Sequence, residues 1–280
     1  GRYNHHAKGF ENEHIYKVDD KIAEKLKEFS KLLFKGTLRH SYPHSWRSKA
    51  PLIYRNTPQW FISMEKNKLR DIALKSIDET VFYPPQGQTR LRSMIETRPD
   101  WCVSRQRVWG VPLPLFVSRE TGQPLRDLEV IERIADIYEE EGSDTWFTED
   151  PQRFLGEKYK LEDYDQVKDV VEVWFDSGST HAFCLEKRED LKWPASMYLE
   201  GSDQHRGWFH SSLLESSGTR GRAPYESVLT HGFVVDGKGR KMSKSLGNVI
   251  SPDDILKKYG VDILRLWVVA SDYYDDLKLD

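Results

Sequence analysis

Cysteine is scarce in this chain of 280 residues, which has only Cys102 and Cys184. Two cysteines are too few for a disulfide framework or a zinc knuckle, so the small disulfide-rich secreted class is excluded. Long apolar runs are also missing, because the longest, near residues 266–270, is far too short to span a membrane and the mean hydropathy is −0.68. No signal-peptide pattern begins the chain. We therefore expect a cytoplasmic protein without a membrane partner.

An excess of positive charge is absent as well. The formal net charge is −3, so the chain lacks the overall basic character of a dedicated nucleic-acid binder. Local contacts to RNA remain open, although solvated faces and ion pairs account for most basic side chains. The candidates for such contacts are Arg39, Arg47, Lys49, Arg55, Arg90, Arg92, Arg98, Arg105 and Arg107.

The most informative stretch runs from His231 to Pro252 and contains Lys-Met-Ser-Lys-Ser at 241–245. A short apolar strand opens here into a loop rich in glycine and lysine. Flexible backbone with two lysines three residues apart can bring mobile positive charge onto phosphate oxygens. A five-residue match alone is weak, and an exposed basic hairpin tip is the alternative, but the whole string favours a nucleotide loop.

A second block, residues 197–209, reads as a strand that ends in glycine and passes into a polar helix start. Asp203 and Gln204 fall in its first turn, at the carboxyl end of the strand, where open α/β sheets bind nucleotides. Their oxygens can accept hydrogen bonds from ribose hydroxyls and from an ammonium group. The alternative is an ordinary helix cap formed by Ser202 or Asp203.

Two further blocks complete a set. Residues 169–181, with Trp-Phe-Asp-Ser-Gly-Ser, read as a strand running into a small-residue turn, and residues 98–110 contain Asp-Trp-Cys-Val-Ser-Arg-Gln. From about Val18 to its end, the chain resembles the bacterial-type isoleucyl-tRNA synthetases of class I. Valyl enzymes share the Asp-Trp-Cys run and are the nearer alternative. A non-catalytic, RNA-binding scaffold is the more distant one, which the intact nucleotide loop and Glu-Gly-Ser-Asp-Gln run disfavour.

The resemblance implies a reaction in which isoleucine and ATP, complexed with Mg²⁺, give isoleucyl-adenylate, and the acyl group then passes to tRNA(Ile). It implies that Lys241 and Lys244 are catalytic and stabilise the triphosphate, within the motif Lys241, Met242, Ser243, Lys244 and Ser245. The residues implied to bind ATP or the adenylate are Glu200, Gly201, Asp203, Gln204 and Lys244. Trp174 and Trp208 would wall the isoleucine side chain, the alternative being that both are core residues. Trp101 and Arg105 would support the site or the acceptor end of the tRNA.

Some family features are missing from these residues. We find no His-x-Gly-His signature, which marks the first half of the adenylate site, and the chain starts with Gly1. The interpretation is an internal fragment that lacks the N-terminal half of the site and most of the editing domain, and that is inactive alone. Ser45 and Ser48 stand where some relatives carry zinc-binding cysteines. Because a neutral hydroxyl is a poor zinc ligand, we predict no metal site.

The expected fold class is α/β. It comprises the second half of a Rossmann-type nucleotide-binding catalytic domain, a small α+β insertion and the start of a C-terminal helical junction. Strand–helix alternation from Val170 to Val235 favours a parallel sheet with covering helices. The predicted regions are the tail of the editing insertion at 1–40, a return into the core at 41–111, the insertion at 112–165, the core with the KMSKS motif at 166–250, and the junction at 251–280.

Hydrophobic periodicity gives the individual elements. The predicted helices are 18–33 with Gly36 as its stop, 66–77, 88–97, 127–141, 252–259 with Ser251 as its cap, and 261–270. The predicted strands outside the motif blocks are 51–64 and a short one that ends at Val117.

Overall fold

The chain divides into two compact units, residues 1–58 and residues 59–280, in a computed structural model that describes residues 1–45 and 48–279. Arg47, one of the candidate RNA contacts, lies outside the described residues. The division of the sequence into the five predicted regions remains a prediction.

The first unit contains one α-helix, α1 (Asp19–Glu28), preceded by the 3-10 turn η1 (Ile15–Lys17), among its described residues. The prediction of a helix to residue 33 is wrong at its end. Ser30 takes a left-handed conformation with φ of 52°, which ends the helix well before Gly36, and Leu33 is fully exposed. The helical spacing of apolar residues therefore continues to Leu33, whereas the helix itself ends at Glu28.

The strand predicted over residues 51–64 is also wrong for most of its length. Only Phe61–Ile62 (β1) is a strand, paired antiparallel with Trp101–Cys102 (β3). Pro51 makes no more than an isolated bridge to His44. The prolines at 51 and 58 have no N–H to donate to a sheet, which disfavours a continuous strand across these positions.

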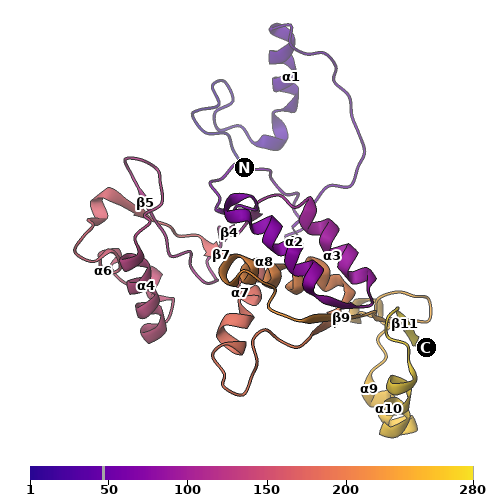
Figure 1. Cartoon of the computed structure of the whole chain (residues 1–280). Helices are drawn as coiled ribbons and strands as arrows, with labels where there is room; N and C mark the ends of the chain where they lie inside the picture. The colour runs from indigo at the N-terminus through magenta and orange to yellow at the C-terminus, as the bar shows by residue number, and fades with distance from the viewer. Residues whose placement is uncertain (46–47, 280) are drawn as a thin grey trace. The chain divides into compact units, whose positions relative to one another are not determined.

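The second unit is built on a parallel sheet with the strand order β2–β9–β8, whose middle strand β9 is labelled in Figure 1. These strands are Val81–Tyr83 (β2), Ser227–His231 (β9) and Tyr198–Gly201 (β8), and both pairings are parallel. The helices α2 (Leu69–Glu79), α3 (Gln86–Glu96) and α8 (Trp208–Arg220) pack with them. This arrangement confirms the mixed α/β class, the parallel sheet, and the helices predicted at 66–77, where η2 (Lys66–Lys68) precedes α2, and at 88–97.

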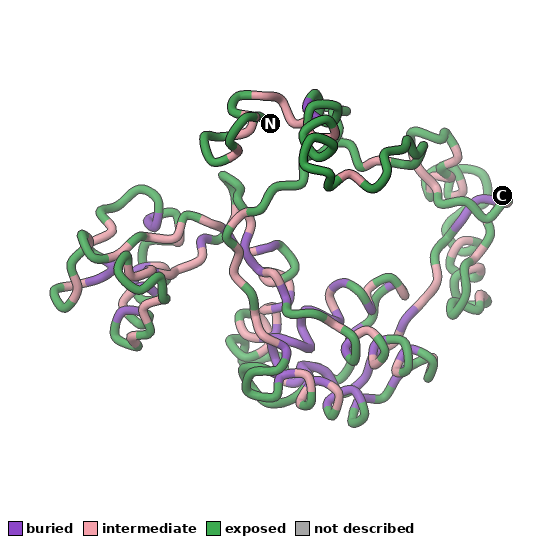
Figure 2. The backbone as a smooth tube through the Cα atoms, turned by 90° about the horizontal axis from the view of Figure 1, so that it is seen from above, coloured by how far each residue is buried: buried purple, intermediate pink, exposed green. Residues whose placement is uncertain are grey.

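Apolar side chains from these helices and strands form one core. Figure 2 shows stretches of buried chain gathered in this layer. Buried members from the helices and strands include Ala73, Ile77, Phe82, Leu91, Ile95, Tyr198, Phe209, Leu213 and Val228. The sheet is therefore a rigid base for whatever its carboxyl edge carries.

A second hydrophobic cluster belongs to residues 116–164 and is centred on Trp146, which is fully buried. Its frame is an antiparallel pair, β5 (Phe116–Ser118) and β6 (Tyr164–Gln166), with α4 (Leu128–Glu141), α5 (Thr145–Thr148), α6 (Pro151–Leu155) and the turn η3 (Leu161–Asp163). Asp127 caps α4 by accepting a 2.9 Å hydrogen bond from the Glu129 amide. The helix predicted at 127–141 is confirmed.

The segment 169–181, predicted as a strand running into a small-residue turn, is a strand only near its start and is helical where the turn was expected. Only Val170–Val171 (β7) is a strand, paired with Ser104–Arg105 (β4). The Trp-Phe-Asp-Ser-Gly run forms helix α7 (Val173–Gly178), and the π-turn η4 (His181–Leu185) follows. Gly178 has no side chain and so lets α7 lie directly against Glu215 of α8.

The C-terminal part begins with β10 (Val234–Asp236), which pairs in parallel with β11 (Leu277–Leu279). Along the chain, β10 is followed by the turn η6 (Lys244–Leu246) and the helices α9 (Pro252–Tyr259) and α10 (Val261–Ala270) before β11 begins. Ser251 caps α9 through a 3.3 Å hydrogen bond from the Asp253 amide, so both predicted helices and the predicted cap are confirmed. No helix in the described residues combines the length and apolar character needed to cross a membrane.

Candidate functional site

Strand β8 ends at Gly201, beside His231 of β9, and the chain turns there into the 3-10 helix η5 (Ser202–Arg206). A side chain on Gly201 would begin 2.8 Å from Asp203 Oδ1 and 3.2 Å from the Phe233 ring, so a larger residue here would displace the Asp203 carboxylate. Neither Ser202 nor Asp203 caps a helix with its side chain. The helix-cap alternative for these residues is therefore wrong.

The polar side chains predicted to bind adenylate lie at this carboxyl edge. Glu200 and Asp203 are exposed, whereas Gln204 is partly buried. Gln204 Oε1 accepts a 2.9 Å hydrogen bond from the Trp208 amide, and Gln204 Nε2 donates a 3.1 Å bond to Asp203 Oδ2. The Gln204 side chain thus orients the Asp203 carboxylate. Carboxylate oxygens of Asp203 and Glu200 stay available to accept hydrogen bonds from a ligand.

The two predicted pocket tryptophans both lie next to Gly207, Trp208 as its neighbour in the chain and Trp174 in space. The Trp208 ring stacks on Tyr198 with centroids 4.0 Å apart, and its Nε1 donates a 2.9 Å bond to the Ser177 carbonyl. Trp174 is 42% exposed, so it is not a core residue. A Cβ on Gly207 would lie 3.1 Å from Trp174 Cη2 and would clash with Gln204 Oε1. The structure therefore brings Trp174, Gln204 and Trp208 together.

The KMSKS loop, residues 237–248, follows β10. Lys241 and Lys244 are exposed, and neither makes an ion pair with any described residue. The Ser243 hydroxyl accepts a 3.3 Å bond from the Leu246 amide and lies 3.2 Å from that of Ser245, while Met242 is partly buried. Within the described residues, no hydrogen bond or ion pair joins the two lysines to Glu200, Asp203 or Gln204.

Two residues that the sequence reasoning missed fix the base of this loop. The Asp236 carboxylate is buried and accepts hydrogen bonds from the Lys238 amide at 3.0 Å, the Arg240 amide at 2.8 Å and Asn248 Nδ2 at 2.9 Å. Asn248 Oδ1 accepts a 2.9 Å bond from the Ser243 amide. The hydrogen bond from Asn248 is the largest cause that holds the pKa of Asp236 below its usual range. An aspartate directly before Gly-x-Gly was the available signal.

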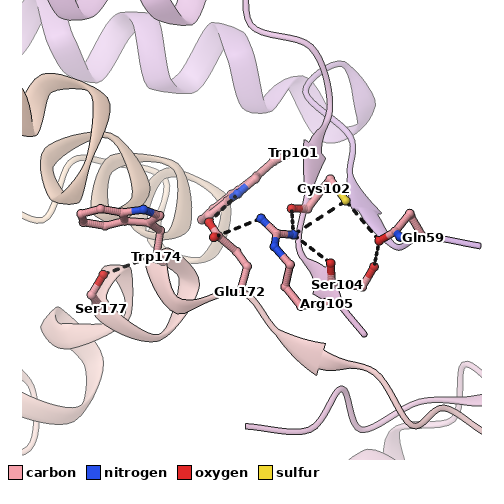
Figure 3. A network of polar contacts seen from close by, with 8 residues as sticks. All are labelled: Gln59, Trp101, Cys102, Ser104, Arg105, Glu172, Trp174 and Ser177. Carbon is pink, nitrogen blue, oxygen red and sulfur yellow. Dashed lines mark hydrogen bonds and ion pairs between the residues drawn. The ribbon is translucent and has the colours of Figure 1, made fainter. Parts of the chain in front are cut away.

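Glu172 is a further residue that the sequence reasoning missed (Figure 3). Its Oε1 accepts a 3.2 Å bond from Trp101 Nε1, and its Oε2 pairs with Arg105 Nη2 at 3.2 Å. Arg105 also donates to the carbonyls of Cys102 and Ser104, at 3.0 and 2.8 Å. The Asp-Trp-Cys block is thereby joined to helix α7, and Trp101 is a buried residue at this junction.

A buried carboxyl group, that of Glu215 on α8, lies against α7. Burial is the main cause that raises the pKa of Glu215 to about 9, with the nearby carboxylates of Asp176 and then Glu172 adding to it. Burial and Glu172 also raise the pKa of Asp176. Glu215 Oε1 is buried without a hydrogen-bond partner in the described residues. The carboxyl group is therefore protonated at neutral pH, because an unpaired buried charge would be costly.

The described residues contain no group of three or more His, Cys, Asp or Glu side chains able to hold a metal ion. Ser45 accepts a 3.3 Å hydrogen bond from the Ser48 amide. The absence of zinc remains a prediction.

Comparison with known proteins identifies the family. The family described as "tRNA synthetases class I (I, L, M and V)" matches residues 7–280. The isoleucine–tRNA ligase of Pelagibacter ubique is 70% identical over 280 residues, which are 100% of this chain and 31% of that protein. The isoleucine–tRNA ligase of Brucella abortus is 61% identical over 264 residues, 92% of this chain and 27% of that protein. The chain thus spans about a third or less of the length of these relatives.

One solved structure supports the fold. Mycobacterium tuberculosis methionyl-tRNA synthetase, solved in complex with methionyl-adenylate, matches with a TM-score of 0.52 at 18% identity, over 87% of this chain and 39% of that one. At this identity the likeness speaks for the fold alone. With the family match over residues 7–280, the chain belongs to the class I tRNA synthetases.

Proposed function

We propose that this chain forms part of the adenylate-forming site of an isoleucine–tRNA ligase, and that its parallel sheet is the second half of a Rossmann-type catalytic domain. The observation that carries the proposal is the 70% identity to the Pelagibacter ubique enzyme over the whole chain. The polar edge of β8 and the exposed lysines of the KMSKS loop support it. In the reaction, isoleucine and ATP give isoleucyl-adenylate and pyrophosphate, and a terminal ribose hydroxyl of tRNA(Ile) then takes the acyl group.

Positioning and charge neutralisation are what the first step requires of the protein. A carboxylate oxygen of isoleucine attacks the α-phosphorus, and the bond to the bridging oxygen breaks as pyrophosphate leaves with the electron pair. Lys241 and Lys244 neutralise the charge that builds on the leaving group, Lys244 by direct contact. Their exposure and lack of ion pairs in the described residues support this role. Mg²⁺ comes with ATP, held largely by phosphate oxygens and water.

The carboxyl edge of β8 holds the nucleoside and the aminoacyl group. Gly201 lets the backbone approach the ligand, and Asp203 and Gln204 accept hydrogen bonds from hydroxyl and ammonium groups. Glu200 contacts the adenylate through its exposed carboxylate. The bond from Gln204 to Asp203 supports this assignment, because it holds the acceptors in one orientation before a ligand arrives.

Trp174 and Trp208 wall the amino-acid side chain. Rigid aromatic rings with few rotatable bonds suit a pocket for a branched aliphatic group. Selection of isoleucine over valine in such a pocket rests on one methylene, which gives roughly 1–3 kcal/mol.

The test is amino-acid-dependent exchange of pyrophosphate into ATP by the complete gene product, with isoleucine, valine, leucine and methionine supplied separately. We expect kcat/KM for isoleucine to exceed that for valine by about 10- to 200-fold. A preference for valine would replace the proposal by a valyl enzyme. Exchange with none of the four, in a folded protein that still binds tRNA, would favour a non-catalytic scaffold. We expect no exchange from residues 1–280 alone.

A further inference from the structure

We propose that Glu172 is a positioning residue, which sets the placement of helix α7 and through it the Trp174 ring, so that selection of the amino-acid side chain depends on an ion pair outside the pocket. The identity of the selected side chain rests on the function proposed above. The placement of Trp174 by Glu172 stands on the geometry of α7.

The start of α7 is held by Glu172. Its side chain is buried, yet it does not cap its own helix. Both carboxylate oxygens reach instead to the Asp-Trp-Cys block, one to Trp101 Nε1 and the other to Arg105 Nη2, each at 3.2 Å. The Glu172 amide donates a 2.8 Å bond to the Val103 carbonyl. Glu172 is therefore fixed from both its backbone and its side chain.

The end of α7 is held by the pocket itself. Trp208 Nε1 donates 2.9 Å to the carbonyl of Ser177, and the Ser177 hydroxyl donates back to the Trp174 carbonyl at 3.3 Å. Trp174 lies between these two anchors, two residues after Glu172. In Figure 3, Trp174 and Arg105 lie on opposite sides of Glu172, so the ion pair acts on the ring only through the helix.

A helix of six residues has too few internal hydrogen bonds to be rigid by itself. Its orientation comes from its contacts with the rest of the unit, which include Gly178 against α8 and the Phe175 ring against Trp101, and Glu172 supplies its charged anchor. Loss of the negative charge would leave Arg105 without its ion partner while Trp101 keeps an acceptor. We therefore expect α7 to shift as a unit and to carry Trp174 with it.

The first experiment reads the ring directly, in the complete gene product labelled with 5-fluorotryptophan. The ¹⁹F resonance of Trp174 is assigned by its loss in Trp174→Phe. In Glu172→Gln this resonance should shift or broaden. Resonances of tryptophans in other parts of the structure, such as Trp146 in the cluster of residues 116–164, should stay in place. Glu186→Gln is the matched control, because Glu186 also pairs with a partly buried arginine, Arg220, at 2.8 Å. An unchanged Trp174 resonance in Glu172→Gln would overturn the proposal whatever the substrate is.

The second experiment tests whether the displacement of Trp174 changes the selection of isoleucine over valine. In pyrophosphate exchange, Glu172→Gln should raise KM for isoleucine by about tenfold, because a side chain displaced by a fraction of an ångström weakens the fit. KM for ATP and kcat should stay within about twofold, and the isoleucine-to-valine ratio should fall. Equal losses of kcat for all substrates, or a lower fraction of active sites alone, would assign Glu172 a merely structural role and overturn the proposal.

A double-mutant cycle with Arg105→Gln separates the ion pair from the rest of the network. If Glu172 acts through Arg105, the double variant should show about the same rise in KM as either single variant. Additive rises would mean that Glu172 does not act through the pair. If the wild type exchanges a different amino acid, the proposed function fails, but the fluorine resonance still decides the role of Glu172.

Discussion

Asn248 Nδ2 donates a 2.9 Å hydrogen bond to Asp236 Oδ2, across twelve residues and across the base of the KMSKS loop. The same amide group donates to the Lys241 carbonyl at 3.2 Å, and its oxygen accepts from Ser243 at 2.9 Å. Lys241 and Lys244 are exposed and make no ion pair in the described residues. The contacts that order their loop therefore come from Asn248, Asp236 and the ion pair of Asp236 with Arg240, and not from the two lysine side chains.

Replacing Asn248 should therefore loosen the loop without touching either lysine. In Asn248→Ala we expect kcat for adenylate formation to fall about tenfold, because the lysines spend less time in the geometry that the reaction needs. Limited proteolysis should cut the loop faster, while Tm changes by only a few degrees. Ser251→Ala is the control, since Ser251 caps the next helix outside the loop. Unchanged proteolysis in Asn248→Ala would show that the hydrogen bonds do not order the loop.

The lysines themselves should act on the rate and not on amino-acid binding. Lys244→Ala should lower kcat by about a hundredfold or more, because loss of one preorganised group that stabilises transition-state charge commonly costs that much. KM for isoleucine should hardly change, since the charge develops on the phosphates. Lys257→Ala, an exposed lysine on α9, is the control. A rise in KM for isoleucine with kcat intact would argue against the proposed role of Lys244.

The sequence predicted those elements whose boundaries are encoded locally. Ser251 before Pro252 and Gly260 after Tyr259 mark the ends of α9, and Asp127 marks the start of α4, so both helices lie where they were expected. The prediction for 51–64 missed a local signal, because Pro51 and Pro58 have no N–H to donate to a sheet. In 169–181 the strand is limited to Val170–Val171 and the expected turn is helix α7, which packs through Gly178 against Glu215 of α8, a contact between residues distant along the chain.

The candidate site divides in the same way. Trp174, Gln204 and Trp208 stand in recognisable motif blocks, and the structure brings them together around Gly207. Glu172 and Asn248 contact residues that are distant along the chain, such as Arg105 and Asp236. The sequence marks Asp236 as a turn residue before Gly-x-Gly, but it does not show which distant residue pairs with Asp236 or with Glu172, so these pairs became visible only in three dimensions.

Stability should depend on pH through Glu215. Its pKa is raised from 4.5 to about 9, so the folded chain holds a proton that the unfolded chain releases between those values. The unfolded state thus binds fewer protons in this window, and the free energy of unfolding contributed by this group falls as pH rises from about 4.5 to 9. Below about pH 4.5 Glu215 is protonated in both the folded and the unfolded state, so this group no longer lowers the free energy of unfolding.

Glu215→Gln removes this titration while keeping the shape of the side chain. We expect it to raise Tm at about pH 8.5, by an amount equivalent to roughly 1–3 kcal/mol, and to change Tm little near about pH 4.5. The control is Glu226→Gln, whose carboxylate lies at an exposed ion pair with Lys192. Equal shifts in Tm at both pH values would show that Glu215 is not a neutral buried acid.

Gly207 should be the position where the smallest added group most disturbs the pocket. A methyl group there would clash with Gln204 Oε1 and press on Trp174 Cη2 at 3.1 Å, so Gly207→Ala should displace both. We expect KM for isoleucine to rise by about tenfold or more, since misplacement of contact groups by about 1 Å can cost a hundredfold. KM for ATP should rise too if Gln204 also holds the nucleoside.

The matched control for that variant lies on helix α8, which begins directly after Gly207. A Cβ on Gly218 would meet only Leu69 Cδ1, at an ordinary 3.5 Å, so Gly218→Ala should fold normally. Because alanine favours a helix interior over glycine by roughly 1 kcal/mol, Gly218→Ala should raise Tm slightly and leave both KM values alone. If Gly207→Ala behaved like this control, Trp174 and Gln204 could not be part of one pocket around Gly207, and the assignment of the amino-acid site would have to move away from α7.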